Sequence, residues 1–302
     1  MDSLQSDSMR VCAAAMSKRF LRFLLRHRLT RPQWVLPLLS LIVASSIWAI
    51  SYALPADASL FDLLFQGVQA VQLSNLSDQQ EIALGSKINQ QILSSDFKLL
   101  DDPAIAKYVD RVGQGLVPYS KRPNLPYHFQ VVQDKQVNAF ATTGGYVYVT
   151  SGLLATAANE AQMAGVIGHE MGHIGARHLI AQMRKQAIES GIASAAGLDR
   201  STAVNLGVQL ALNLPGSRRQ EFEADHLGLF TITQAGYDPK ALPAFMKNLV
   251  NSASVPAFLS NHPATPDRIR TLNQLIDQNN LTGSGGLDNA AYQSTVRSRL
   301  TG

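Results

Sequence analysis

The chain has 302 residues, enough for one large domain with a sizeable buried core. Its formal charge of +4 comes from one end, because seven Lys or Arg and only two Asp precede Trp34. Basic charge confined to a short tail excludes a nucleic-acid-binding domain face. Cys12 is the only cysteine, which excludes an internal disulfide and any cysteine-based metal site or nucleophile after the tail.

The first predicted element is an apolar segment. Residues 34–54 form a run of 21 residues without a charged side chain. At about 1.5 Å per residue, such a helix spans roughly 30 Å, the thickness of a bilayer's hydrocarbon core. Trp48 and Tyr52 lie near its end, where aromatic rings favour the membrane interface. Because the basic tail precedes the segment, we expect the tail in the cytoplasm and the chain from residue 55 onward on the exported side.

Two fates of this segment stay open. A retained transmembrane anchor fits its length, since the apolar region of a signal peptide usually has about 7–15 residues. Cleavage near Ala58 fits the small residues Ala56 and Ala58, and would leave a secreted or periplasmic protein. In both cases we expect the working domain on the periplasmic or lumenal side.

The remaining chain is predicted to be mostly helical. A Ser77/Gln80 capping box and an Asp102-Pro103 start mark the first two helices. Hydrophobic periodicity predicts helices over about 76–93, 101–117, 159–185, 186–196, 201–213, 217–235, 239–251 and 265–279. Aromatic and β-branched runs predict strands at 127–132 and 146–149, with a turn or bulge in between.

These elements predict an α+β fold, mostly helical, with a small sheet and one N-terminal transmembrane helix. The predicted parts are a basic cytoplasmic tail, an anchor or uncleaved signal, a juxtamembrane apolar segment, a metallopeptidase domain and a loose C-terminal extension; their bounds are 1–33, 34–54, 55–76, 77–280 and 281–302.

His169, Glu170 and His173 form a His-Glu-x-x-His pattern on the long predicted helix. Residues at i and i+4 project from one helix face, so both imidazoles can bind one zinc ion. Glu170 lies beside them and can act as the general base that takes the proton of a zinc-activated water. The pattern therefore predicts one catalytic Zn²⁺ per chain. A purely structural zinc is disfavoured, because it gives Glu170 no role.

The third ligand is predicted downstream of this helix. His178 follows His173 by five residues, about 140° around a continuous helix, so we expect it to be structural rather than a ligand. Glu221 and Asp225 share a helix face; Glu221 can bind the metal, and Asp225 can hold the outer nitrogen of a ligating histidine. Glu223 is expected to face away.

The segments "VIGHEMGHIGARH" and "SRRQEFEAD" resemble the gluzincin peptidases that include the CAAX prenyl protease, HtpX, the Oma-type protease and BepA. The resemblance runs from about residue 77 to 279 and is strongest for singly anchored or periplasmic BepA-like members. It implies a zincin-type (minigluzincin) fold with Glu221 as third ligand and Asp225 behind a ligand.

The same resemblance implies two further features. Residues 137–154 are similar to the family's edge strand, which implies that substrate backbone adds along Tyr146, Val147, Tyr148 and Val149. A histidine in the loop that holds His262 implies either a fourth ligand that keeps the enzyme latent or a catalytic hydrogen-bond donor. A loop histidine without a role is the third alternative.

The combined prediction is a membrane-anchored zinc metalloendopeptidase that cleaves unfolded or misassembled envelope proteins. Its partners would be those substrates and the membrane, with no nucleic acid; the oligomeric state stays open. The rival is a chaperone or assembly factor for exported proteins in which proteolysis is latent. Replacing Glu170 by Gln would separate the two, because only proteolysis needs the general base.

Overall fold

The computed structural model describes residues 70–191, 197–213, 215–252, 256–263 and 266–300, which all belong to the unit Ser59–Gly302. Its strands are β1 (Ala70–Val71), β2 (His128–Val132), β3 (Ala139–Ala141), β4 (Tyr146–Thr150) and β5 (Leu198–Asp199). Its longer helices are α4 (Asp78–Ser95), α5 (Pro103–Leu116), α7 (Glu160–Gly175), α8 (His178–Glu189), α9 (Arg200–Asn213), α10 (Arg218–Gln234), α11 (Ala241–Val250) and α13 (Pro266–Gln278). The short helical segments are η1 (Val117–Tyr119), η2 (Thr143–Gly145), α6 (Ser151–Thr156), α12 (Ala257–Asn261), α14 (Asn289–Tyr292), η3 (Gln293–Arg297) and α15 (Ser298–Leu300).

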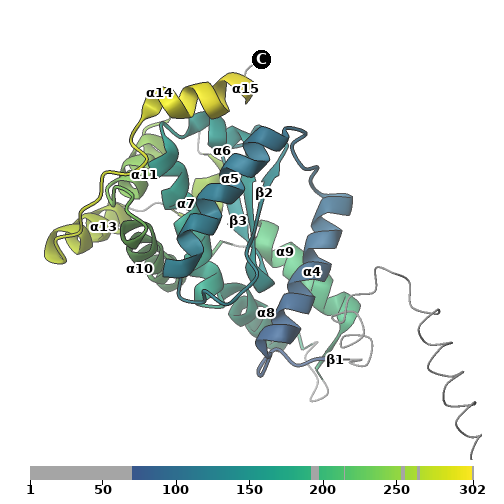
Figure 1. The fold of residues 1–302 in the computed structure, drawn as a ribbon. Helices are drawn as coiled ribbons and strands as arrows, with labels where there is room; N and C mark the ends of the chain where they lie inside the picture. The colour runs from purple at the N-terminus through teal and green to yellow at the C-terminus, as the bar shows by residue number, and fades with distance from the viewer. Residues whose placement is uncertain (1–69, 192–196, 214, 253–255, 264–265, 301–302) are drawn as a thin grey trace, which may run out of the picture. The chain divides into compact units, whose positions relative to one another are not determined.

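A three-stranded sheet of order β2-β4-β3 lies between two groups of helices (Figure 1). Strand β4 is parallel to β2 and antiparallel to β3, to which it is joined by η2. In η2, Gly144 and Gly145 have φ of 74° and 99°, a region that favours glycine. The predicted strands at 127–132 and 146–149 are confirmed, while β3 lies in the stretch predicted to be a turn or bulge.

Side chains of β4 alternate between two cores. Val147 and Val149 belong to the core shared with α5, α7, α10 and α11, and Tyr146 and Tyr148 belong to the core shared with α4, α8 and α9. This alternation is the period of two that a strand imposes, and it places helices on both faces of the sheet. The fold is therefore mostly helical α+β with a small sheet, as predicted.

The capping signals are confirmed where they were most specific. Ser77 and Gln80 form the predicted capping box of α4, and Asp102 accepts from the backbone N–H groups of Ala104 and Ile105 at the start of α5. The predicted continuous helix 159–185 is wrong, because α7 ends at Gly175 and α8 begins at His178. Between them Arg177 is in the left-handed region, with φ of 57°.

Two predicted boundaries also change. Residues 281–300 do not form a loose extension, because Tyr292 and Val296 are fully buried in the core around α7. At the other end, β1 pairs with β5, and Leu73 and Leu76 are buried, so the last part of the predicted juxtamembrane segment belongs to the domain. Residues 282–286 are rich in glycine, and nothing in their sequence indicated this packing.

The predicted transmembrane segment 34–54 lies outside the described residues. In the part of the chain that the structure describes, none of the helices has both the length and the apolar character needed to cross a membrane.

Candidate metal centre and active site

Helix α7 carries the three residues of the His-Glu-x-x-His pattern into the interior. The Asn159 side chain accepts from the Gln162 N–H and starts the helix where predicted. His169 and Glu170 are buried, and the side chain of His173 is 12% exposed. One helical turn brings the Nε2 atoms of His169 and His173 to 3.1 Å from each other.

Helix α10 packs closely along α7 because glycines lie at the contact. A Cβ atom on Gly172 would lie 2.6 Å from the carbonyl oxygen of Ala224, and one on Gly228 would lie 2.7 Å from the backbone nitrogen of His169. At either position, a residue with a Cβ atom would require the two helix backbones to move apart. The close approach brings Glu221 of α10 to the two histidines.

Four side chains from three segments converge on one point. His169, His173, Glu221 and His262 each offer a ligand atom, and these atoms lie within 4.8 Å of one another. From Glu221, Oε2 lies 3.4 Å from His169 Nε2 and Oε1 lies 3.5 Å from His173 Nε2. His262 Nδ1 lies 3.3 Å from His169 Nε2 and 3.3 Å from Glu221 Oε2.

These separations fit a tetrahedral metal ion. Ligand atoms placed about 2.0–2.1 Å from a central ion at tetrahedral corners are about 3.3 Å apart. The oxygens of Glu221 are also buried, and no described residue donates a hydrogen bond of good geometry to them. Arg268 Nη1 lies 2.8 Å from Oε2, and a metal ion among the ligand atoms would supply further positive charge beside this carboxylate. The residues present therefore fit a metal ion, which agrees with the predicted ligand set.

Behind the ligands lies a buried ion pair that the sequence analysis missed. Asp225 Oδ1 lies 3.0 Å from His169 Nδ1, the outer contact that was predicted. Arg268 of α13, which is only 1% exposed, donates to both oxygens of Asp225 at 2.7 Å and to the carbonyl of Pro263 at 3.0 Å. Its Nη1 also lies 2.8 Å from Glu221 Oε2. Arg268 thus links the two carboxylates to the loop that follows His262.

Glu170 lies on the open side of the ligand group. Both of its oxygens are buried without a hydrogen bond from a described residue, and Oε1 lies 3.4 Å from His262 Nε2. His262 therefore faces the metal ligands with Nδ1 and the carboxylate of Glu170 with Nε2. Of the three alternatives for His262, this geometry corresponds to the fourth-ligand position.

The local electrostatics favour a positive ion at this point. Burial lowers the pKa of His169, but the facing carboxylates of Asp225 and Glu221 outweigh it and raise the pKa to about 9. Burial and the neighbouring His169 hold the pKa of His173 well below its ordinary value, so that this imidazole is neutral, as a ligand must be. Burial raises the pKa of Glu170.

His178 and Glu223 lie closer to the site than the sequence predicted. Because α7 ends before His178, the ring of His178 folds back to 4.9 Å from the ring of His173, centroid to centroid. Glu223, which was expected to face away, lies with Oε2 3.5 Å from His178 Nε2. His178 does not belong to the group of four described residues that could hold a metal ion.

The prediction that residues 146–149 form an edge strand is wrong. Tyr146, Val147, Tyr148 and Val149 lie in β4, which is the central strand and pairs with β2 on one side and β3 on the other. A strand with both edges paired has no backbone groups left for a substrate. The two aromatic and β-branched runs were recognised as strands, but the order of strands in the sheet could not be read from them.

Strand β3 is the edge next to the metal ligands. The Thr142 N–H donates to Tyr146 O at 2.9 Å and the Thr150 N–H donates to Asn138 O at 3.1 Å. This alternation directs the backbone groups of even-numbered residues toward β4, so those of Ala139 and Ala141 point to the outer side.

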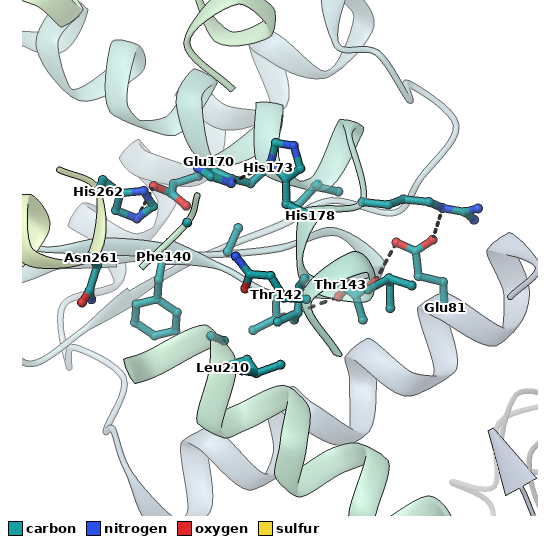
Figure 2. A pocket seen from close by; sticks show the side chains of 18 residues that line it. Glu81, Phe140, Thr142, Thr143, Glu170, His173, His178, Leu210, Asn261 and His262 are labelled. Carbon is teal, nitrogen blue, oxygen red and sulfur yellow. Dashed lines mark hydrogen bonds and ion pairs between the residues drawn. The ribbon is translucent and has the colours of Figure 1, made fainter. Parts of the chain in front are cut away.

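A cleft runs from the metal ligands along the end of β3 (Figure 2). Figure 2 shows Glu170, His173 and His262 on one side of it and Phe140 and Thr142 on the other. The far end is lined by Thr143 and Glu81, and Leu210 of α9 adds an apolar side chain.

Comparison of the sequence with those of known proteins places the chain in a family. The model of peptidase family M48 matches residues 103–276. The beta-barrel assembly-enhancing protease of Escherichia coli K12 is 30% identical over 65% of this chain and 44% of its own length. The metalloprotease LoiP of the same organism is 32% identical over 68% of this chain and 84% of its own length.

A eukaryotic protein matches the chain as well. The mitochondrial metalloendopeptidase OMA1 of Schizosaccharomyces pombe is 32% identical over 57% of this chain and 53% of its own length. Apart from LoiP, the chain spans about half the length of these relatives. The matches confirm the resemblance and, at the level of the family, the prediction of a metalloendopeptidase. The chain belongs to peptidase family M48.

Proposed function

We propose that the chain is a zinc metalloendopeptidase with His169, His173 and Glu221 as metal ligands and Glu170 as general base. The observation that supports this most is the convergence of four ligand atoms within 4.8 Å of one another, beside the buried carboxylate of Glu170, to which no described residue donates a hydrogen bond. Zinc is the ion proposed, because it favours four tetrahedral nitrogen and oxygen ligands in proteins.

The protein's own residues divide the work as follows. Asp225 Oδ1, 3.0 Å from His169 Nδ1, would hold the proton on that nitrogen and leave the Nε2 lone pair for the metal. Glu170 accepts the proton of the attacking water at a carboxylate oxygen and passes it to the leaving amine. Zinc, when bound, supplies Lewis-acid polarisation of the scissile carbonyl and lowers the pKa of water. Arg268 offsets the charge of the ligand carboxylate Glu221 and of Asp225 behind His169.

We propose unfolded or misassembled envelope proteins as the substrates. Addition of a strand to β3 would use the backbone groups of Ala139 and Ala141, and these bind any extended chain. A folded protein has its backbone groups already paired, so it is a poor partner for this edge. The name of the E. coli relative, a beta-barrel assembly-enhancing protease, supports a role in the cell envelope. The same proposal includes a membrane anchor at residues 34–54, with the catalytic domain on the exported side.

His262 supports a latent state of this enzyme. Its Nδ1 takes the place in the ligand group that water and substrate need, and its Nε2 faces Glu170. Opening would require the loop that contains His262 to leave. The same contact favours the second candidate function, a chaperone or assembly factor that binds extended chains and cleaves them rarely.

Both candidates are tested by measuring bound zinc and casein cleavage for the full chain in detergent. The variants are wild type, Glu170→Gln and His262→Ala. We expect about one zinc ion per chain in all three, no cleavage by Glu170→Gln, and faster cleavage by His262→Ala.

The outcomes separate the hypotheses. Zinc binding without cleavage in any form, His262→Ala included, would favour the chaperone function. A wild-type chain that binds no zinc would overturn the metal site itself. Loss of zinc in His262→Ala would make His262 a required ligand rather than a latch.

A further inference from the structure

The chain breaks between α7 and α8 at a position that controls the surroundings of His173. In a continuous helix His178 would lie about 140° around the axis from His173. Instead Arg177 adopts φ of 57°, a conformation that costs energy for a residue other than glycine. The break turns the first residue of α8 back onto the last turn of α7, and the two imidazole rings meet.

The contact between the two histidines is short and buried. His178 Nδ1 lies 2.9 Å from His173 Nδ1, and the His178 side chain is only 6% exposed. On its far side, His178 Nε2 lies 3.5 Å from Glu223 Oε2, and Glu223 Oε1 lies 3.7 Å from Lys121 Nζ. Nδ1 of His173, which faces away from the other metal ligands, therefore contacts the imidazole of His178.

When His173 Nε2 binds a metal ion, one arrangement of protons satisfies these contacts. His173 presents Nε2 to the other ligand atoms, so its proton lies on Nδ1. His178 must then accept at Nδ1 and carry its own proton on Nε2, which faces the carboxylate of Glu223. The direction of donation is from His173 to His178 to Glu223. At His169, the atom that faces the outer nitrogen is a carboxylate oxygen, Asp225 Oδ1, 3.0 Å from Nδ1.

Two carboxylates of α4 hold the strained residue Arg177. Arg177 Nε donates to Glu81 Oε2 at 2.8 Å, and its Nη2 donates to Asp78 Oδ1 at 2.7 Å. Glu81 is itself fully buried and accepts from Arg122 and from the Thr143 hydroxyl. These contacts tie the start of α8 to α4, and so they determine where His178 lies relative to His173.

We propose that His178 is a positioning residue for His173, which it holds in the tautomer and orientation needed to bind the metal. Glu223 supports His178 from outside, and Arg177 provides the break in the helix that makes the contact possible. This inference rests on the proposed zinc site and extends it. It assigns a role to a histidine that the spacing in the sequence excludes as a ligand and leaves as structural.

The test measures zinc affinity by competition with a chromophoric chelator, together with thermal unfolding of the zinc-free protein. The variants, made in the full chain, are His178→Phe, which keeps a ring but has no nitrogen, and His178→Asn, whose Oδ1 can accept the same proton. The control is His226→Phe on the exposed side of α10. We expect zinc affinity to fall about 10- to 100-fold in His178→Phe, to recover most of the way in His178→Asn, and not to change in the control.

The zinc-free proteins decide whether the effect is only structural. We expect zinc-free His178→Phe to unfold close to the temperature of zinc-free wild type, so that the loss appears in metal binding alone. Zinc affinity of His178→Phe within about twofold of wild type would overturn the inference while leaving the zinc site intact. Absence of zinc binding by wild type would overturn the proposed function instead.

One measurement on the wild-type protein needs no variant. In the zinc-loaded chain, imidazole nitrogen-15 shifts should show His173 protonated at Nδ1 and His178 protonated at Nε2. If His178→Phe does not fold, this measurement decides. His178 protonated at Nδ1 would overturn the inference, because two N–H groups cannot form the 2.9 Å contact.

Discussion

The carboxylate of Glu81 is fully buried and joins α4 to three other segments of the chain. Arg122 donates to both of its oxygens at 2.8 and 2.9 Å, Arg177 donates to Oε2 at 2.8 Å, and the Thr143 hydroxyl donates to Oε1 at 2.6 Å. Burial raises the pKa of Glu81, but these donors outweigh it and leave the pKa below the ordinary value of 4.5. The ionised form is therefore the one that stabilises the fold.

This lowered pKa predicts a pH-dependent loss of stability in Glu81→Gln. Above pH about 5.5 we expect the variant to unfold with a free energy about 2–3 kcal/mol lower than wild type, because the arginines lose a buried charge partner. As the pH falls below about 4.5, wild type loses this stabilisation and the two proteins converge. Urea unfolding at several pH values measures the difference. The control is Asp78→Asn, whose side chain is 65% exposed and should have a much smaller effect. A difference that does not depend on pH would contradict the assignment.

Among the helices and strands, the contact between α7 and α10 determines whether the proposed metal ligands come together. Both helices were expected from periodicity, and the carboxylate of Glu221 reaches the histidines only because the helix axes lie very close. Gly172 and Gly228 allow this approach. Neither glycine ends a helix, so a packing role is the physical reason for glycine in a helix interior, where it otherwise costs stability.

We expect Gly228→Ala to loosen the metal site. Its Cβ would lie 2.7 Å from the backbone nitrogen of His169, so α10 must shift. The free energy of unfolding should fall by about 1–3 kcal/mol and zinc affinity should fall with it, measured by urea unfolding and chelator competition. Gly115→Ala in α5 is the control, because a Cβ there meets nothing within 4 Å. That variant should be unchanged or more stable by up to about 1 kcal/mol. Zinc affinity unchanged in Gly228→Ala would contradict the requirement for close packing.

At the scale of the whole molecule, the C-terminal segment completes the main core. The Gly286 carbonyl accepts from the Ala161 N–H at the start of α7 at 2.9 Å. The Tyr292 hydroxyl donates to the Leu154 carbonyl at 2.9 Å, and Val296 is fully buried. The segment therefore covers the end of the helix that carries the metal ligands, and Figure 1 shows α14 near α6.

Removal of the Tyr292 ring should therefore destabilise the whole domain. We expect Tyr292→Ala to lower the free energy of unfolding by about 3–5 kcal/mol, because a fully buried aromatic ring leaves a cavity and an unpaired carbonyl. Tyr119→Ala, at a side chain that is 46% exposed, should change it by less than about 1 kcal/mol. Urea unfolding of both variants checks this. Equal effects in the two variants would show that the segment is not part of the cooperative core.

Local chemistry along the chain was sufficient for much of this protein. The spacing of His169 and His173, the caps at Ser77, Asp102 and Asn159, and the four-residue spacing of Glu221 and Asp225 each depend on neighbours within a few residues. Helix geometry then converts spacing into direction without further information. For this reason most of the helices, two strands and the candidate ligands His169, His173 and Glu221 could be proposed from the sequence, whereas His262 came only from the family resemblance.

Only the tertiary structure decided how those elements meet. Strand order made β3 the edge and β4 the centre, and a strand's own residues do not reveal its neighbours. Arg268 lies 43 residues from Asp225, and a lone arginine in a helix is usually a solvated side chain. The break at Arg177 depends on carboxylates of α4. Residues 281–300 pack against core residues that are far from them in the sequence. Each of these arises from contacts between distant segments, which no local pattern records.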